Sequence, residues 1–135
     1  RVTLNFDRLT GGTSSQYLLI QLGTSGGTVT SGYSTASTYW GASASNGTAT
    51  NGWQSIGWYP ATNWMSGTMF FHTVGSNIWI GNCLYFGEST SGVVQAYNDA
   101  MQGRVALSGA LTSVVIGVVS GSTAFSGGTV SCMYE

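Results

Sequence analysis

The sequence predicts an all-β fold, an antiparallel β-sandwich or barrel formed by a single domain over residues 1–135. Segments in which apolar and polar residues alternate recur roughly every 8–15 residues, as in strands that bury one face. Many of the 21 glycines lie between these segments, where the chain must turn. No segment has the apolar periodicity of a long helix.

The first part of the chain contains three expected β segments and a loop. Val2–Phe6 alternates apolar and polar residues, which predicts a half-buried strand. Tyr17–Leu22 is apolar on both faces and is expected to be a central strand, followed by a hairpin connection at Thr24–Gly27. Thr28–Trp40 is polar and β-prone. Ala42–Gly52 consists of small and polar residues, so we expect a loop there.

The middle of the chain carries an aromatic segment followed by two strands. Pro60 lies in the aromatic segment, residues 53–66, and argues against a central strand there. Strands are predicted over Gly67–Thr73 and Ile78–Phe86, with a turn at Val74–Asn77 between them. Alternation along the second strand divides its bulky residues between two faces, with Ile80, Leu84 and Phe86 on one and Trp79, Cys83 and Tyr85 on the other.

The last part of the chain ends in two strands rich in apolar residues. Before them we expect a loop at Glu88–Gly92 and a turn at Gln102–Arg104. Local propensity would allow a short helix at Val93–Met101, but its neighbours favour a strand with a bend. Leu111–Val119 and Thr129–Tyr134 then alternate as strands joined by a glycine-rich connection. No other part of the chain is so dense in β-branched apolar residues. The sequence therefore predicts that this closing hairpin forms the spine of the core.

Charge is scarce, and this excludes several classes of protein. Only 5% of the residues are charged, against about 25% in ordinary domains, and there is no lysine. Three scattered arginines (Arg1, Arg8 and Arg104) are too few to neutralise a phosphate backbone or bind an anionic membrane, so we expect no nucleic-acid partner. No apolar run reaches the roughly 18 residues of a membrane span, which predicts no membrane insertion. The weak charge repulsion favours a surface covered by copies of the chain or by other subunits, and hence a homo-oligomer.

The residues needed for catalysis are sparse. His72 is the only histidine, so a hydrolytic triad would depend on it alone, and a structural role is the simpler interpretation. A glycosidase needs two carboxyl groups that flank one bond. Glu88 and Asp99 lie in one predicted stretch of loop and bend between strands, but solvated acids in a loop are the simpler interpretation. Neither a phosphate-binding loop nor a metal-ligand spacing occurs, so we predict no enzyme, no cofactor and no metal.

The two cysteines, Cys83 and Cys132, both lie in predicted strands. Two cysteines are too few to indicate a disulfide framework. The spacing leaves both possibilities open: two buried thiols or a single disulfide.

An aromatic cluster is the better candidate for a binding site. Four of the five tryptophans fall between residues 40 and 64, together with asparagine and glutamine. Indoles stack on the apolar faces of sugars, and amides bond to their hydroxyls, so this composition suits a neutral glycan. The alternative, which is the more usual role of tryptophan in a protein with little charge, is packing in a core or a subunit interface. The candidate stacking residues are Trp40, Trp53, Trp58, Tyr59 and Trp64.

From Tyr17 onward, the order of features resembles a jelly-roll domain found near the C-termini of bacteriophage tail and fibre proteins. The residues that carry the resemblance are Tyr17-Leu-Leu-Ile, Gly67-Thr-Met-Phe-Phe, Ile78-Trp-Ile80, Leu111-Thr-Ser-Val-Val-Ile-Gly, Ser120-Gly-Ser-Thr-Ala-Phe125-Ser-Gly-Gly-Thr-Val130 and Met133-Tyr134. In that family, a strand ending in Ser-Gly, a Phe, a Gly-Thr and a final Tyr close the sandwich. The resemblance implies a jelly-roll-like structural module of the virion, in a tail, a fibre or a capsid. It also implies a trimer that contacts other virion proteins and, in some cases, host-surface polysaccharide.

Three functional hypotheses follow. The first is a phage virion protein that assembles with itself and with other virion proteins, with possible adhesion to a host glycan. The second is a free-standing carbohydrate-binding module of a secreted protein, which the aromatic cluster favours. The third is a small hydrolase that uses Glu88 or Asp99.

Overall fold

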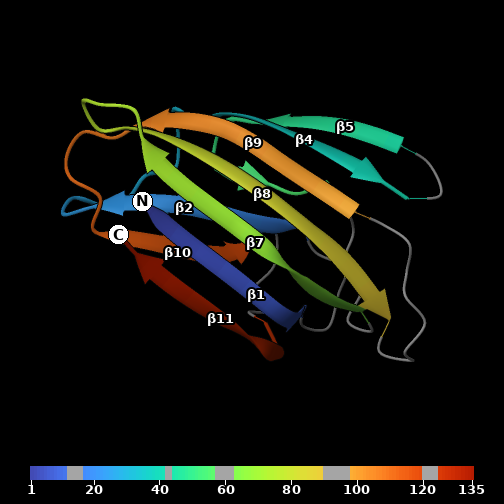
Figure 1. The fold of residues 1–135 in the computed structure, drawn as a ribbon. Coiled ribbons are helices and arrows are strands. Elements are labelled where there is room, and N and C mark those ends of the chain that lie inside the picture. Colours follow the sequence, from blue (N-terminus) through green and yellow to red (C-terminus); the bar gives the residue numbers. More distant parts are fainter. Residues whose placement is uncertain (12–16, 42–43, 57–62, 90–97, 120–124) are drawn as a thin grey trace.

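The computed structural model describes residues 1–11, 17–41, 44–56, 63–89, 98–119 and 125–135 (Figure 1). These ranges contain strands and no helix, which confirms the all-β prediction. Two antiparallel sheets pack face to face as an open sandwich. The strands are β1 (Val2–Thr10), β2 (Leu18–Thr24), β3 (Gly27–Thr28), β4 (Ser34–Trp40), β5 (Ala44–Ala49), β6 (Trp53–Gln54), β7 (Asn63–Thr73), β8 (Ile78–Ser89), β9 (Asn98–Ala106), β10 (Ser113–Val118) and β11 (Gly127–Tyr134).

The larger sheet has seven strands in the order β11-β1-β7-β8-β9-β4-β5. Its longest strands are the neighbours β7 and β8, joined by the turn predicted at Val74–Asn77. The Ile78 N–H donates to the Gly75 carbonyl at 2.9 Å across this turn, and three successive residues, Gly75, Ser76 and Asn77, have positive φ. The edges of the sheet are β11 and β5.

The smaller sheet lies behind the larger one in Figure 1 and is built around β2. Strand β10 pairs along one edge of β2, while β3 and β6 pair at the two ends of its other edge. The predicted hairpin at Thr24–Gly27 joins β2 to β3 and is confirmed.

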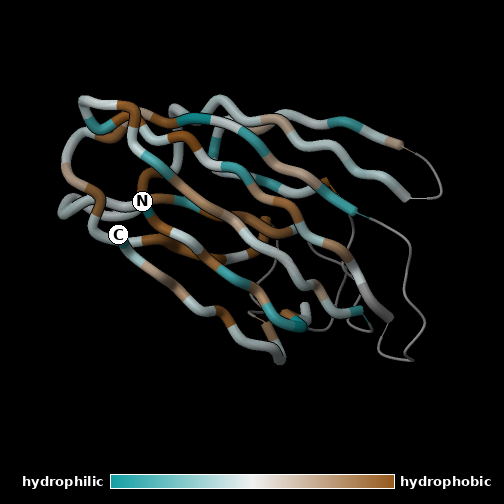
Figure 2. Tube along the Cα trace, viewed as in Figure 1, coloured by the Kyte–Doolittle hydropathy of each residue, from teal (hydrophilic) through white to brown (hydrophobic). Residues whose placement is uncertain are grey.

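The core lies between the two sheets. Apolar residues alternate with polar ones along β1 and β11 and are more continuous along β2 and β10 (Figure 2). Each fully buried large side chain stabilises the fold by about 1.5–3 kcal/mol. The buried hydrophobic residues are Val2, Leu4, Phe6, Leu9, Leu18, Ile20, Leu22, Tyr33, Trp53, Met65, Met69, Phe71, Trp79, Cys83, Tyr85, Met101, Val105 and Leu107.

Buried hydroxyl groups fasten the two sheets together. The phenol of Tyr33, just before β4, accepts a hydrogen bond from the Leu22 N–H of β2 at 2.8 Å and donates to the Val29 carbonyl at 3.0 Å. On β4, Thr35 donates to the Gly52 carbonyl at 2.9 Å, and Ser37 donates to the carbonyl of Gln54. These bonds satisfy interior backbone groups at and near the short strands β3 and β6, which pair with only two residues of β2 each.

Strand β8 has the two faces that its alternation predicted. Trp79, Cys83 and Tyr85 are buried, whereas Leu84 and Phe86 are 61% and 42% exposed. The buried set faces the smaller sheet, and the exposed set lies on the outer face of the larger sheet. Residues of β7 and β9 that pair with the exposed set of β8 lie on the same outer face, because paired residues share a face of the sheet.

The prediction that the last two strands form a hairpin at the spine of the core is wrong. Strands β10 and β11 do not pair with each other: β10 pairs with β2 in the smaller sheet, and β11 pairs with β1 in the larger one. Every residue of β11 is exposed. Composition explains why both segments form strands, but it does not specify which strands they join.

Three local predictions also need correction. The loop expected at Ala42–Gly52 contains β5, which pairs with β4 over six residue pairs. An edge strand that buries little needs few apolar residues, so its small polar side chains gave no strand signal. The turn expected at Gln102–Arg104 lies inside β9, and β8 continues through Glu88 to Ser89. The strand predicted at Val93–Met101 is observed from Asn98, and its earlier residues lie outside the described ranges.

Candidate interaction surfaces

Trp53 lies at the centre of the core. Its indole is fully buried and makes edge-to-face contacts with Tyr33 at 5.2 Å and Phe71 at 5.0 Å between ring centroids. It presents no surface on which a sugar could stack. The glycan-stacking assignment is therefore corrected for Trp53, which has the packing role that was its alternative.

The other predicted stacking residues do not form one cluster. Trp40 is 48% exposed at the end of β4. Trp64 is half-buried on β7 beneath the guanidinium of Arg8, which lies 4.6 Å from the ring centroid. Three strand spacings separate β7 from β4, or about 14 Å. Trp58 and Tyr59 lie outside the described residues.

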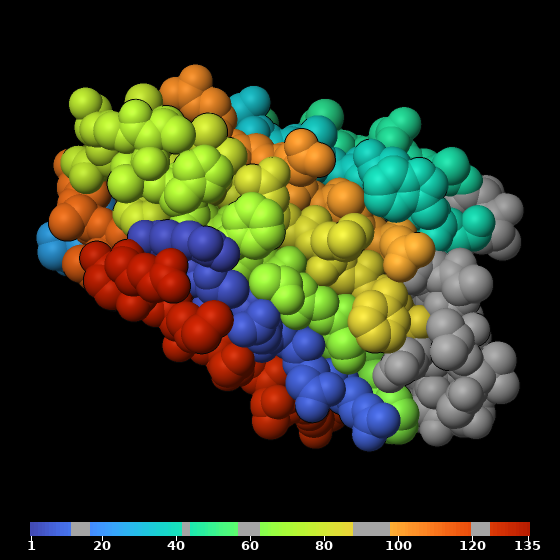
Figure 3. Space-filling view, viewed as in Figure 1, coloured from blue at the N-terminus to red at the C-terminus, as the bar shows by residue number. Residues whose placement is uncertain are grey.

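Trp40 belongs instead to a cross-strand row on the outer face of the larger sheet, the face seen in Figure 3. Phe86 of β8 pairs with Asn98 of β9, and Asn98 pairs with Trp40. Two exposed aromatic rings therefore flank an exposed amide. Sequence reasoning missed Phe86 as a site residue, although the alternation of β8 had placed it on this face.

A shallow depression of about 520 Å³ lies on the same face, four residues or more along the strands from this row. Its floor includes Ala36, whose methyl side chain is small. Two amides, Asn82 and Gln102, line it, with Arg104 as its only charged residue among those described. An adjoining hollow of about 320 Å³ lies between β4 and β5. It is lined by Ala36, Ser37 and Thr38 of β4 and by Asn46, Gly47 and Thr48 of β5. Amides and hydroxyls with almost no charge suit a neutral, polyhydroxylated ligand.

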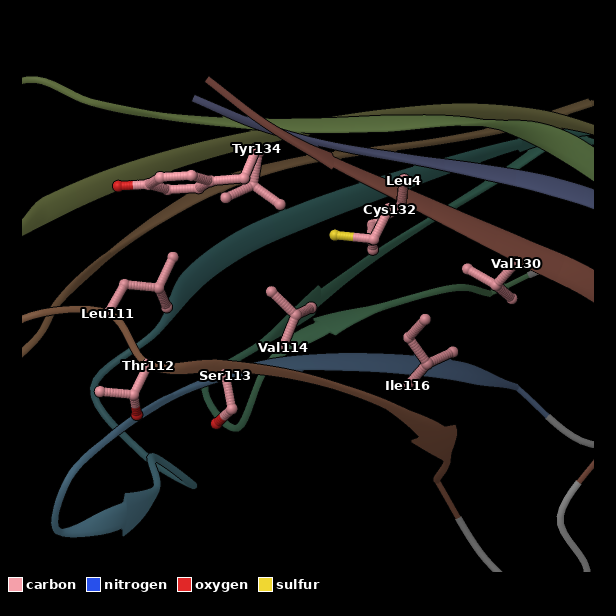
Figure 4. Close-up of a pocket in the computed structure, with 10 residues that line it drawn as sticks. Leu4, Leu111, Thr112, Ser113, Val114, Ile116, Val130, Cys132 and Tyr134 are labelled. Carbon is pink, nitrogen blue, oxygen red and sulfur yellow. The ribbon is translucent and has the colours of Figure 1, made fainter.

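The open side of the sandwich, between β10 and β11, holds an apolar groove of about 270 Å³ (Figure 4). Val130, Cys132 and Tyr134 of β11 point from the larger sheet toward Val114 and Ile116 of β10. The remaining lining residues are Val2, Leu4, Leu111, Thr112 and Ser113. Sequence reasoning missed this groove because it placed β10 and β11 side by side in one sheet.

The two cysteines are free thiols. The register Cys132–Leu4–Met69–Cys83 places them in one row with three strand spacings between them, or about 14 Å. A disulfide needs Cα atoms within about 7 Å, so the bridged alternative does not apply. Burial, with the nearby charge of Asp99 as a smaller cause, raises the pKa of the Cys83 thiol. Cys132 is exposed beside the groove.

The groups considered for catalysis are not brought together. His72 lies on the outer face of β7, whereas Asp99 is fully buried on the inner face of β9. Asp99 Oδ2 accepts a hydrogen bond from the Ile56 N–H at 3.2 Å. The side chain of Glu88 lies outside the described part of the structure. Among the described residues, no group of three or more His, Cys, Asp or Glu side chains could hold a metal ion.

Comparison of the chain with protein-family models, with curated proteins and with solved structures gave no match. The fold therefore stands as an all-β protein with two antiparallel sheets. The described residues also include no helix long and apolar enough to cross a membrane.

Proposed function

We propose that the chain is a structural module of a phage virion, which associates with copies of itself and with other virion proteins. The observation that carries this proposal is the open side of the sandwich. There, an eight-residue edge strand, β11, in which every residue is exposed, borders an apolar groove. Soluble monomers normally protect such an edge with charges, prolines or a covering loop. An exposed edge of this kind is suited to assembly.

The distribution of charge supports the same function. No charged residue occurs between Arg104 and Glu135, a stretch that contains both β10 and β11. Several bulky side chains of the larger sheet are also exposed, including Phe70, Leu84 and Met133. A surface with little charge and many apolar groups gains free energy when another protein covers it. The resemblance of the closing motif to phage tail and fibre domains supports the virion as the location.

Two measurements test this proposal. Light scattering over a wide range of concentration is expected to show a mass above that of the single chain, rising as concentration increases. Mass spectrometry of purified phage particles is expected to find the chain as a stoichiometric component. A strictly monomeric chain at high concentration, absent from particles, would contradict the proposal.

A second function, binding of a neutral glycan, is favoured by the row of Phe86, Asn98 and Trp40 and by the amide-lined depression beside it. It fits either host adhesion by a virion protein or a carbohydrate-binding module of a secreted protein. The test is titration with neutral glucans, galactans and mannans. Trp40→Ala is expected to weaken binding at least tenfold, whereas Val115→Ala, on the smaller sheet, is expected to leave it unchanged. Equal binding by both variants would remove this function.

A further inference from the structure

The outer edge of β11 carries unpaired backbone groups at alternate residues. At the end of the β1–β11 pair, the Glu135 N–H donates to the Arg1 carbonyl at 2.9 Å, and the Arg1 nitrogen donates to the Glu135 carbonyl. Hydrogen-bonded and non-hydrogen-bonded pairs alternate along an antiparallel ladder. The N–H and C=O groups of Val130, Cys132 and Tyr134 therefore point away from β1. None of the described strands pairs with this edge.

The two edges of the larger sheet differ in what they expose. Strand β5, at the other edge, presents only Ala, Ser, Asn, Gly and Thr. Strand β11 presents Val130, Met133 and Tyr134, which are 38%, 53% and 81% exposed. Covering β11 would therefore bury apolar area as well as pair backbone groups, whereas covering β5 would bury little. If one edge of the sheet is a contact surface, the free energy favours β11.

We propose that β11 pairs antiparallel with β11 of a second copy of the chain, about a twofold axis at Ser131. This inference deepens the proposed function, on which it rests, by naming its self-association surface. In this register, the outward N–H and C=O groups of Val130 form hydrogen bonds with those of Cys132 in the other copy. The twofold axis repeats the same pair of bonds between Cys132 of the first copy and Val130 of the second. Ser131 faces its own counterpart in a non-hydrogen-bonded pair. The two larger sheets become one continuous sheet across the axis.

A second copy fits this edge because the strand is complementary to itself in that register. Tyr134 lies opposite Gly128, which has no side chain to obstruct the ring. Val130 and Cys132, both on the groove side, lie opposite each other. The absence of charge from residues 105–134 removes repulsion between two copies. It also leaves no charge that would select an acidic or basic peptide in place of a second copy.

The pairing also brings the two apolar grooves together at the axis. Val130, Cys132 and Tyr134 line the groove and belong to the paired strand, so both features are covered in one contact. An edge of eight residues is well below the 20–30 residues that each partner contributes to a standard interface, so we expect a dissociation constant on the order of micromolar. A twofold contact yields dimers, in contrast to the trimer that the family resemblance implies.

Cross-linking tests the register. In a non-hydrogen-bonded pair the facing Cα atoms are about 4.5 Å apart, within disulfide range. The double variant Ser131→Cys, Cys132→Ser is expected to form a covalent dimer in oxidised glutathione. Thr48→Cys, Cys132→Ser, with the new thiol on β5, is the matched control and is expected to remain uncross-linked. A dimer linked through native Cys132, with none through Ser131→Cys, would overturn the proposed axis.

Charge insertion tests the surface independently. Ser131 is exposed, so Ser131→Lys is expected to keep the wild-type melting temperature while placing two ammonium groups opposite each other. We expect at least a tenfold weaker association in light scattering, with Thr48→Lys unchanged. Undiminished association of Ser131→Lys, without cross-linking through Ser131→Cys, would overturn the β11 contact and leave the proposed assembly function standing. A wild-type chain that never associates would remove both.

Discussion

The indole of Trp53 lies directly against Gly81. A Cβ atom at Gly81 would come within 2.7 Å of Trp53 Cε2 and 2.9 Å of Phe71 Cδ1. Trp53 belongs to the smaller sheet and Gly81 to the centre of the larger one, so this contact sets how closely the sheets approach at that point. The glycine is needed here for space, since its φ is not in the left-handed region.

Gly81→Ala is therefore expected to destabilise the protein by about 1–3 kcal/mol, because the added methyl overpacks a core in which both neighbours are rings. Equilibrium unfolding in urea measures the change. Gly109→Ala is the control, since a Cβ there would meet nothing within 4 Å. A Gly81→Ala variant as stable as Gly109→Ala would contradict this account of the sheet contact.

Trp53 and Trp40 differ in burial, so their truncation is expected to reduce the free energy of unfolding by very different amounts. Trp53→Ala leaves a large cavity in the core and is expected to cost about 3–5 kcal/mol. Trp40→Ala removes a half-exposed ring on the outer face and is expected to cost less than about 1 kcal/mol. Urea unfolding of both variants measures the difference. Comparable losses would show that Trp40 is needed for the fold and is unsuited to a ligand surface.

Tyr33 is expected to contribute to stability through its hydroxyl group. Tyr33→Phe keeps the ring contact with Trp53 but leaves the buried Leu22 N–H and Val29 carbonyl without the bonds that the phenol makes. An unsatisfied buried backbone group costs about 1–3 kcal/mol, so the melting temperature is expected to fall. The control is Tyr134→Phe, whose phenol is exposed. Equal melting temperatures for the two variants would contradict the bracing role of Tyr33.

Much of the fold could be predicted from the sequence, because alternation and turn chemistry act locally. The faces of β8 followed from its period of two, and the turns at Thr24–Gly27 and Val74–Asn77 followed from their glycines. Which strand pairs with which could not be predicted, because β-propensity reports how well a segment fits a pleated, half-buried surface and does not specify its partner strand. The separation of β10 from β11 is the clearest case, and it created the groove.

The aromatic site was only partly predictable, for a related reason. Closeness in sequence suggested one cluster, but Trp53 and Trp40 lie on opposite faces of the larger sheet, one inside the sandwich and the other outside. Asn98, which pairs with Trp40, and Phe86, which pairs with Asn98 on its other side, come from strands far from Trp40 in the sequence. Composition identifies residues suited to a ligand, whereas their assembly depends on long-range register.

Alkaline pH is expected to destabilise the protein through two buried groups. Burial raises the pKa of both the Cys83 thiol and the Tyr33 phenol above their usual values of 9.0 and 10.0, and hydrogen bonding to Leu22 offsets part of the Tyr33 shift. The folded chain thus retains protons that the unfolded chain releases, so the free energy of unfolding falls as pH rises above about 9. Below that pH the thiol and the phenol are protonated in both the folded and the unfolded chain, so their titration does not reduce the free energy of unfolding.

The Cys83 thiol alone is expected to lower the free energy of unfolding by up to about 1.4 kcal/mol for each pH unit above 9. Urea unfolding between about pH 8 and pH 10.5 measures this slope. Cys83→Ala removes the first titration, so its decline should begin about one pH unit later, where Tyr33 takes over. Cys132→Ala, which removes an exposed thiol, is the control and should follow the wild-type profile. Identical profiles for Cys83→Ala and the wild type would show that the buried thiol does not govern alkaline unfolding.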